Sequence, residues 1–547
     1  MKFQFFGKLA DSRLLLVAAL LLPALFLAKP FHLDDGVFLN MGDRMPWTFF
    51  GGEPQDVNFD GQVHAKLSPY ESTHPPLIPY LLKLIGAVPT AGQHPFMLYH
   101  LLFLVFPLGA LLAGLSLARQ LKTSALPLWF LLAAPAFLVI ATSLMTDVAL
   151  TAFWMGAVAL QLRHDETNRR SMAVGVFLCS CGAMLVAFQA VVVPVLLLAY
   201  GFYRKRRVCI WAPLASLLVF TVYLLVIYRQ SGFFPILAHT ADLNIASLLE
   251  MGSVASNQRH KLTAVLVQLG FNLLPAIPWL VAGQNKGSRL TLGWISFVVS
   301  AVWFEVVASE DWMGAYSSSH FLVLRLWFVL GCYWVMSLAM QLPRLFRLRE
   351  VSLPGEALTR LSLLWFFGVI TYNIVLMPYV NARYILPALP AALLVAMARS
   401  RTNKGLGFGV LLALCLGLGC SYLDQARARS DYALFGEMAK HIKQPQRLYY
   451  CNDHGLGRYL SVWGASYLEL DREDLPAGSL VLWTGKSVHP KLAEKLREVA
   501  RFPYASPGGF TLYGPGSGGG FYSSHEGLLP LARAPLLQDA ILFERVP

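Results

Sequence analysis

Two adjacent carboxylates, Asp34 and Asp35, directly follow an apolar run over residues 14–28. A carboxylate held beside a hydroxyl group can accept its proton as a general base. The alternative role is structural, because acidic side chains also stabilise the start of a helix through its dipole. Asp147 opens a later apolar run, and its alternative role is a helix N-cap. Asp34, Asp35 and Asp147 are therefore the candidate catalytic residues.

Four further residues at the ends of apolar runs are candidates for substrate binding: His74, His320, Arg383 and Tyr384. Arg383 is a cation at the start of a run, in Asn381-Ala-Arg-Tyr-Ile-Leu-Pro387. An arginine in this place suits a phosphate group at the depth of lipid headgroups. The alternative is an ion pair with a carboxylate such as Asp311.

The composition indicates a membrane protein. Of the 547 residues, 56% are apolar and 14% are charged, and the mean hydropathy is +0.53; soluble domains carry about 25% charged residues. The net charge of +13 comes from short Lys and Arg clusters between apolar runs, whereas a nucleic-acid-binding protein concentrates its positive charge on one face. We therefore expect membrane lipids and no nucleic acid as partners. The seven cysteines match no disulfide framework or metal-site spacing.

Thirteen apolar runs fit membrane-spanning helices, because about 20 residues cross the hydrocarbon core and a short span needs fewer. The first run has Phe26 where a cleaved signal peptide needs a small residue, so we expect this run to be retained. The predicted spans are approximately 12–28, 96–118, 125–143, 146–162, 171–185, 188–203, 208–228, 262–283, 290–307, 320–342, 360–378, 382–398 and 405–423.

Basic residues in alternate loops give the predicted orientation. Cytoplasmic loops are rich in Lys and Arg, and every second loop is basic when the N-terminus is placed in the cytoplasm. These loops lie near residues 119–122, 163–170, 204–207, 286–289, 344–349 and 399–404. We expect a multi-pass protein of the bacterial inner membrane with its C-terminal region, including Cys451, in the periplasm.

Three long regions fall on the predicted outer side: 29–95, 229–261 and 424–547. In the first, Val37, Phe38, Met41 and Met45 share one helical face and Asp35 lies off it, as in a helix at the membrane interface.

The last outer region changes composition and predicts a separate domain. Apolar stretches at 447–450, 479–483 and 541–546 predict strands, and residues 491–500 predict a helix. The fold class is thus an all-α polytopic membrane protein with about 13 spans in residues 1–423, followed by a small α/β periplasmic domain in residues 424–547.

Ionisable residues beside the spans gather at their outer ends. A transporter needs polar groups near the middle of the membrane, and Gln268 and Asn272 are the nearest in this chain. This distribution favours a pocket at the outer membrane surface.

Four motifs in order resemble those of the GT-C glycosyltransferases. They are Leu33-Asp-Asp-Gly-Val-Phe-Leu-Asn-Met41, Thr73-His-Pro-Pro-Leu-Ile-Pro-Tyr80, Met145-Thr-Asp-Val-Ala-Leu150 and Ala382-Arg-Tyr-Ile-Leu-Pro387. The resemblance covers nearly all of the membrane region. Within this superfamily the chain most resembles the bacterial family 39 branch of protein O-mannosyltransferases and lipid A aminoarabinose transferases.

The resemblance implies a polyprenyl-phosphate-linked sugar donor and a catalytic acid in the first outer loop. Asp34 matches the leading Asp of the family's Asp-Glu pair, and Asp35 replaces its usual Glu. His74 stands where many members have Lys before two prolines.

The expected activity is transfer of a sugar to a lipid, protein or glycan acceptor with inversion at the anomeric carbon. Asp34 would be the base, Asp147 or Asp35 would orient the acceptor or a metal ion, and Arg383 would hold the departing phosphate. Inversion is expected because a retaining reaction needs a further carboxylate nucleophile. A divalent cation bridged by carboxylates and phosphate is compatible with this reaction, and the spacing of the residues does not decide whether one is bound. The alternatives are a lipid-linked-sugar flippase or exporter and a polysaccharide polymerase.

Overall fold

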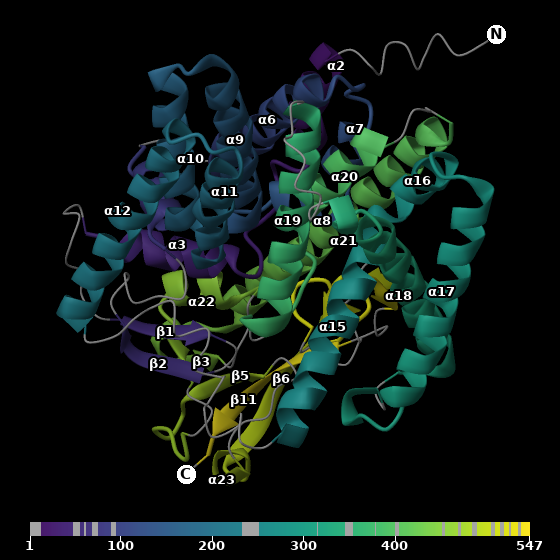
Figure 1. Ribbon diagram of the computed structural model, residues 1–547. Coiled ribbons are helices and arrows are strands. Elements are labelled where there is room, and N and C mark those ends of the chain that lie inside the picture. The colour runs from purple at the N-terminus through teal and green to yellow at the C-terminus, as the bar shows by residue number, and fades with distance from the viewer. Residues whose placement is uncertain are drawn as a thin grey trace.

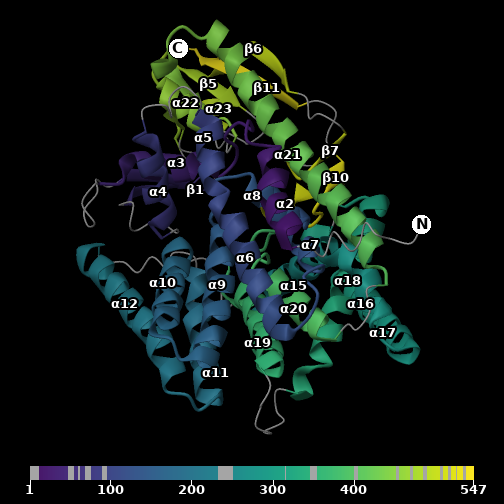
Figure 2. The ribbon, with the colours of Figure 1, turned by 90° about the horizontal axis from the view of Figure 1, so that it is seen from above.

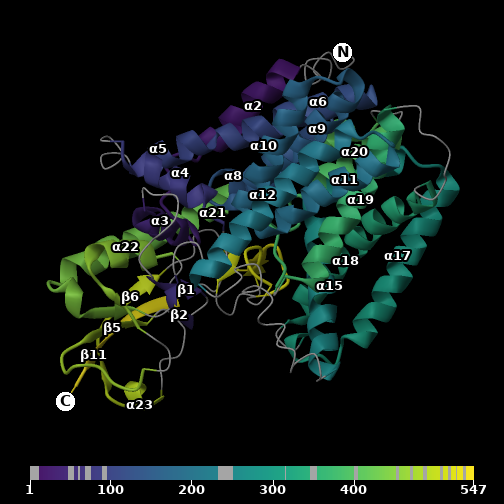
Figure 3. The same ribbon diagram turned by 60° about the vertical axis from the view of Figure 1, so that its left-hand side comes forward.

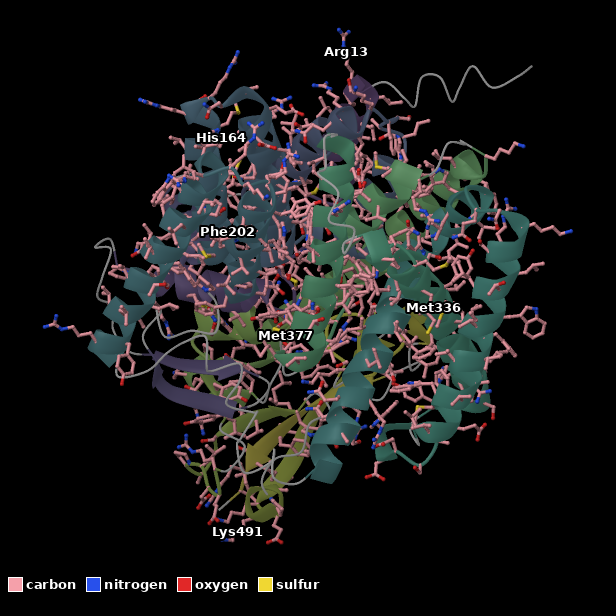
Figure 4. The ribbon with its side chains drawn as sticks, in the orientation of Figure 1. Arg13, His164, Phe202, Met336, Met377 and Lys491 are labelled. Carbon is pink, nitrogen blue, oxygen red and sulfur yellow. The ribbon has the colours of Figure 1, made fainter. Side chains whose placement is uncertain are left out.

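The protein is a body of helices with a small sheet at one end (Figure 1). Figure 4 shows Arg13, near the start of the first helix, and Lys491, beside the sheet, at opposite ends of the molecule. The computed structural model describes residues 12–46, 55–59, 62–67, 75–88, 95–231, 251–313, 316–344, 354–377, 379–399, 404–450, 455–468, 472–483, 490–504, 509–514, 519–524, 527–533 and 538–546.

The apolar runs in the first part of the chain form helices where spans are predicted. They are α2 (Ser12–Ala24), α5 (Pro95–Phe103), α6 (Val105–Leu121), α7 (Leu128–Leu132), α8 (Pro135–Ala141), α9 (Thr146–Thr167), α10 (Arg170–Val186), η2 (Phe188–Val191), α11 (Val192–Tyr203) and α12 (Val208–Ser231).

The second part of the helical region continues this pattern. Its elements are α15 (Met251–Leu273), η3 (Leu274–Ala276), α16 (Ile277–Ala282), α17 (Lys286–Val306), η4 (Asp311–Met313), α18 (Ser318–Ala339), η5 (Leu342–Arg344), α19 (Pro354–Val375), α20 (Ala388–Arg399) and α21 (Leu406–His441). Glycines set the contact between α15 and α18, because a Cβ at Gly270 or Gly331 would overlap a main-chain carbonyl of the other helix.

Large apolar side chains cover the outer faces of the helical body. Trp211 on α12 and Trp294 on α17 are each 67% exposed, and Figure 2 places these two helices at opposite edges of the molecule. Such surfaces are stable in lipid. Within the described residues, seven helices are long and apolar enough to cross a membrane, or up to eight if one bent pair is a single span. The protein is therefore a polytopic membrane protein, and the count of thirteen stays a prediction.

The bent pair is α8 and α9, which meet at 112°. The predicted span 125–143 is divided here into the short helices α7 and α8. Asn272 on α15 supports the start of α8, because its Oδ1 accepts a 2.7 Å hydrogen bond from Ala136 N. The predicted polar residue of the mid-membrane region thus stabilises a broken helix.

The first region predicted to lie outside contains α3 (Asp35–Arg44), β1 (Gln55–Phe59), β2 (Gln62–Leu67) and α4 (Leu77–Gly86). Phe38, Met41 and Met45 are buried, as expected for the apolar face of α3. Asp35 is also fully buried, which its predicted place off the apolar face of this helix does not anticipate. The reason is local: main-chain N–H groups satisfy its carboxylate, as described below.

A five-stranded sheet in the C-terminal region has the order β4-β3-β5-β11-β6. Strand β3 pairs in parallel with β4 and β5, and β11 pairs antiparallel with β5 and β6. The elements of this region are η6 (Pro445–Arg447), β3 (Leu448–Tyr450), α22 (Gly457–Trp463), β4 (Ser466–Tyr467), β5 (Leu480–Trp483), α23 (Pro490–Ala493), β6 (Leu496–Tyr504) and β11 (Gln538–Arg545).

The strands predicted at 447–450, 479–483 and 541–546 are confirmed, but the helix predicted over 491–500 is wrong. Only α23 is helical there, and the rest belongs to β6. Residues of β6 pair with β11 from Leu496 to Tyr504. This pairing decides the conformation, because strand formation depends more on partners than on intrinsic preference.

Part of the C-terminal region packs on the helices instead of on the sheet. The C-terminal segment, described at 509–514, 519–524 and 527–533, contains β7 (Phe510–Thr511), β8 (Tyr513–Gly514), β9 (Gly519–Gly520) and β10 (Ala532–Arg533). Its buried apolar residues, including Phe521 and Leu528, belong to the helical core. Figure 3 shows this yellow segment between α15 and the sheet. Helix α21 runs through the predicted domain boundary at residue 423, and that boundary stays a prediction.

Candidate functional site

Asp34 lies at the start of α3 but does not cap it. It occupies the N-cap position, and its side chain makes no capping hydrogen bond. Its Oδ2 is paired with Arg383 Nη1, and the Asp34 side chain is 27% exposed while that of Arg383 is buried. The carboxylate partner of Arg383 is therefore Asp34 and not Asp311. The site thus pairs the accessible carboxylate of Asp34 with the buried cation of Arg383.

Arg383 is held by a series of turns over residues 382–387, before α20. Asn381 Oδ1 accepts a 2.8 Å hydrogen bond from Tyr384 N, and Asn373 Nδ2 on α19 donates to Tyr384 O at 3.1 Å. The Arg383 guanidinium lies 5.1 Å from the Tyr384 ring centroid. These contacts hold the turn that carries Arg383.

Asp147 lies beneath this pair, in the first turn of α9. It is 2% exposed, and Arg383 and Asp34 both act electrostatically on it. Its Oδ2 is buried without a hydrogen-bond partner. Buried polar atoms are normally hydrogen-bonded, so an unsatisfied one needs a functional or structural explanation. An acceptor or donor hydroxyl group could satisfy this oxygen.

Asp35 has a different environment from Asp34. Its Oδ1 accepts a 2.7 Å hydrogen bond from Leu144 N, and its Oδ2 accepts one of 3.1 Å from His32 N. Burial raises the pKa of Asp35 to about 6, although Lys29 and the two N–H groups oppose the shift. Leu144 lies in the break between α8 and α9, so Asp35 connects the turn that carries Asp34 to the helix that carries Asp147. We propose that Asp35 positions these residues and does not contact substrate.

The remaining predicted residues have different outcomes. Tyr384 is buried beside Arg383. His320 lies in the first turn of α18, where its N–H donates to Ser317 Oγ at 3.4 Å, and α18 packs on α15 and α17. His74 lies outside the described residues. The geometry therefore brings together Asp34, Asp147, Arg383 and Tyr384.

A buried ionic cluster that the sequence does not predict lies next to the site. It consists of Lys29, His32, Asp424 and Asp431. Lys29 Nζ donates to Asp424 Oδ2 at 2.5 Å, and the His32 nitrogens lie 3.4 Å from Asp424 Oδ1 and 3.2 Å from Asp431 Oδ2. Burial opposes the charge of His32, but hydrogen bonds and attraction from both carboxylates outweigh it and raise its pKa to about 9. The available signal was the seven-residue spacing of Asp424 and Asp431, which places them on one helix face.

The polar side chains of the site are carboxylates, one arginine and one tyrosine. Within the ranges that the structure describes, no group of three or more His, Cys, Asp or Glu side chains is placed to hold a metal ion. We therefore derive no step through a metal ion. The arrangement suits proton removal by Asp34 and binding of an anion by Arg383.

No protein-family model and no curated protein matches the chain. Among solved structures, the chain is similar to ArnT from Cupriavidus metallidurans bound to undecaprenyl phosphate, with 15% identity, a TM-score of 0.42 and coverage of 90% of this chain and 96% of that chain. For the same ArnT in the apo state the values are 15%, 0.41, 89% and 95%.

The chain is also similar to an Archaeoglobus fulgidus oligosaccharyltransferase tethered to an acceptor peptide, with 11% identity, a TM-score of 0.29 and coverage of 83% and 63%. Identities and TM-scores of this size assign neither a family nor an activity to this chain.

Proposed function

We propose that this protein is a membrane glycosyltransferase that moves a sugar from a polyprenyl-phosphate donor to an acceptor on the periplasmic side of the inner membrane. One observation carries the proposal: the accessible carboxylate of Asp34 lies on the buried cation of Arg383, at the place where the motifs predict a base and a phosphate ligand. The acceptor class is lipid A or lipopolysaccharide, protein, or an envelope glycan.

In the proposed reaction, an Asp34 oxygen accepts the proton of the acceptor hydroxyl group. The acceptor oxygen then forms a bond to the anomeric carbon, and the bond between that carbon and the phosphate oxygen breaks. The lipid phosphate leaves with the electron pair. Arg383 stabilises its charge, because charge-assisted hydrogen bonds from arginine to phosphate are strong.

Asp147 and Arg383 set the electrostatics of this step. The buried carboxylate of Asp147 balances part of the Arg383 charge, and its Oδ2 is buried without a hydrogen-bond partner. We propose that Asp147 orients the acceptor hydroxyl group and that Asp34 is the base of a single displacement with inversion.

The direct test compares envelope glycolipids and glycoproteins from cells with and without the gene by mass spectrometry. We expect one sugar-sized mass difference on one acceptor class, restored by the wild-type gene. NMR of the isolated product should show an anomeric configuration opposite to that of the donor. Movement of donor across liposomes without a new glycosidic bond would identify a flippase instead. A ladder of product lengths would identify a polymerase.

A further inference from the structure

Tyr522, in the C-terminal segment, contacts both sides of the proposed site. Its OH donates a 2.7 Å hydrogen bond to Asp424 Oδ1 in the buried ionic cluster, and its ring meets that of His32 edge to face, with 6.1 Å between centroids. Its main-chain O accepts a 2.8 Å hydrogen bond from Asn381 Nδ2, beside Arg383. One residue close to the C-terminus therefore joins two regions that are far apart in sequence.

The contacts on the Arg383 side are made mainly by the main chain. Phe521 O accepts from Ala382 N, and Ser524 N donates to Val380 O, each at 2.9 Å. Gln268 Nε2 of α15 holds the same segment through Gly520 O at 3.1 Å. Substitution of the Tyr522 side chain therefore leaves the hydrogen bonds around Arg383 in place.

The contacts on the Asp34 side depend on side chains. His32 is fixed between Asp424 and Asp431, and the next residue, Leu33, has a φ of +50°. A bulky residue keeps this left-handed conformation only where its surroundings enforce it. His32 precedes Leu33, and Asp34 follows directly. The ionic cluster thus holds the residue two positions before Asp34.

We propose that Tyr522 and His32 are positioning residues of the glycosyltransferase proposed above, so that the C-terminal segment completes the active site by aiming Asp34. Tyr522 supplies one of the three donors that surround the Asp424 carboxylate, together with Lys29 and His32. Without its hydroxyl group, Asp424 and His32 are less constrained, and the strained turn at Leu33 can relax. The inference rests on the proposed function, because aiming a base matters only if Asp34 accepts a proton.

Tyr522→Phe tests this role, because it removes only the hydroxyl group. The assay measures release of undecaprenyl phosphate from an undecaprenyl-phosphate-linked sugar in proteoliposomes that contain the full-length protein and the acceptor identified by mass spectrometry. We expect kcat to fall about tenfold or more, since misplacement of a reacting group by about 1 Å can reduce a rate by about 100-fold. The donor KM should change by less than about twofold, because the Arg383 side is held by the main chain.

Tyr200→Phe is the matched control. Tyr200 OH also donates to a buried carboxylate, Asp165 Oδ2, at 2.8 Å, but at the other end of the helical body. It should leave kcat within about twofold of wild type at a similar loss of thermal stability. Hydrogen exchange should become faster at residues 32–36 in Tyr522→Phe and stay unchanged there in the control.

The outcomes separate the inference from the proposed function. If the wild type releases undecaprenyl phosphate, and Tyr522→Phe matches Tyr200→Phe in kcat and in exchange at residues 32–36, the positioning role is overturned and the transferase stands. A fall in activity caused only by a higher donor KM also overturns it, because the hydroxyl group would then act on donor binding. If the wild type releases nothing while donor is bound, both proposals fail.

Discussion

Two buried ionic groups at opposite ends of the helical body have opposite chemical character. The first, which we call the inner group because it lies on the predicted cytoplasmic side, consists of Asp165, Tyr200, Arg204 and Arg206. It is near His164, which lies at the same end of the molecule as Arg13 (Figure 4). Asp165 accepts from Tyr200 OH at 2.8 Å and Arg204 Nε at 3.0 Å, and Arg206 Nε lies 3.1 Å from its Oδ1. Both oxygens of its carboxylate have partners, from residues 35 to 41 positions away in the sequence.

The second group, which we call the outer group, comprises Asp34, Asp147 and Arg383 with the adjoining cluster of Lys29, His32, Asp424 and Asp431. It is incomplete by comparison. Among the described residues, Asp147 Oδ2 and Arg383 Nε are buried without hydrogen-bond partners, and the turn before Asp34 is strained at Leu33. Unsatisfied buried polar atoms are destabilising, and a fully satisfied network makes the protein rigid. The difference indicates that the inner group stabilises the helices, whereas the outer group is arranged for a ligand.

The first prediction places the two groups on opposite sides of the membrane. In a protein without other cysteines, a membrane-impermeant maleimide should label Cys451 in intact spheroplasts, provided that its thiol is exposed. Arg207→Cys, next to the inner group and exposed, should be labelled only after lysis. This result is all-or-none. The reverse pattern would show that α8 and α9 form one bent span and that the chain crosses the membrane one time fewer before residue 204.

The second prediction concerns the two carboxylates at the centre of the groups. Asp34→Asn keeps the shape of the side chain and removes its basicity, so transfer should be at least about 100-fold slower. The variant should still insert and bind undecaprenyl phosphate. Asp165→Asn should lower thermal stability, because it leaves two arginines without their full partner, but turnover per folded molecule should stay within about threefold.

The same assay decides between the carboxylates of the outer group. Asp35→Asn and Asp147→Asn should both be impaired, Asp35 through the position of the turn and Asp147 through orientation of the acceptor. If Asp34→Asn retains near-normal turnover while Asp35→Asn is inactive, Asp34 is not the base. Full activity of both variants would remove the first outer loop from the catalytic site.

The parts of this site that the sequence predicts are those with a local signal. Asp34 and Asp147 each adjoin an apolar run, which places a carboxylate at the membrane boundary, and Arg383 breaks the rule that charges avoid such runs. The helices follow from the same runs. Apolar length is a reliable signal because lipid requires every main-chain group to be hydrogen-bonded within its own segment.

The parts that the sequence does not predict depend on contacts between distant residues. Lys29 and Asp424 are 395 residues apart, and no local pattern pairs them. Asp34 and Asp35 are adjacent and chemically identical. Asp35 is nevertheless the buried one, because the N–H groups of Leu144 and His32 donate hydrogen bonds to its carboxylate. The C-terminal segment has the composition of a loop, and its place in the helical core follows from hydrogen bonds to α15 and the Arg383 turn.

The third prediction compares the arginines of the two groups. Arg383→Ala should reduce kcat/KM for the donor by about 10- to 100-fold, because a charge-assisted contact to phosphate contributes about 1.5 to 3 kcal/mol. Arg383→Lys should recover part of the loss. Arg204→Ala should leave donor dependence unchanged, because its partner is Asp165. If a folded Arg383→Ala protein shows wild-type donor dependence, Arg383 only pairs with Asp34.

The last and smallest effect is a dependence of stability on pH that belongs to the outer group alone. The pKa of His32 is raised to about 9, above the value of about 6.5 expected for unfolded histidine. Its stabilising contribution is therefore complete below pH 6.5 and is lost as pH rises through 9. The difference in pKa corresponds to about 3 kcal/mol, or a change in Tm of about 2 to 3 °C for a chain of this length.

Asp35 and Tyr522, which both contact His32, do not titrate between pH 7 and 9.5. Asp35, with a pKa of about 6, is already ionised above pH 7. Burial and Asp424 raise the pKa of Tyr522 well above its usual value, so it does not titrate there. Asp424, Asp431, Lys29 and Arg427 supply the remaining charges. Between pH 7 and 9.5, the Tm of wild type should therefore fall relative to that of His32→Gln. Parallel curves would mean that His32 is neutral in the folded protein and that the carboxylates of α21 do not hold the turn before Asp34 by charge.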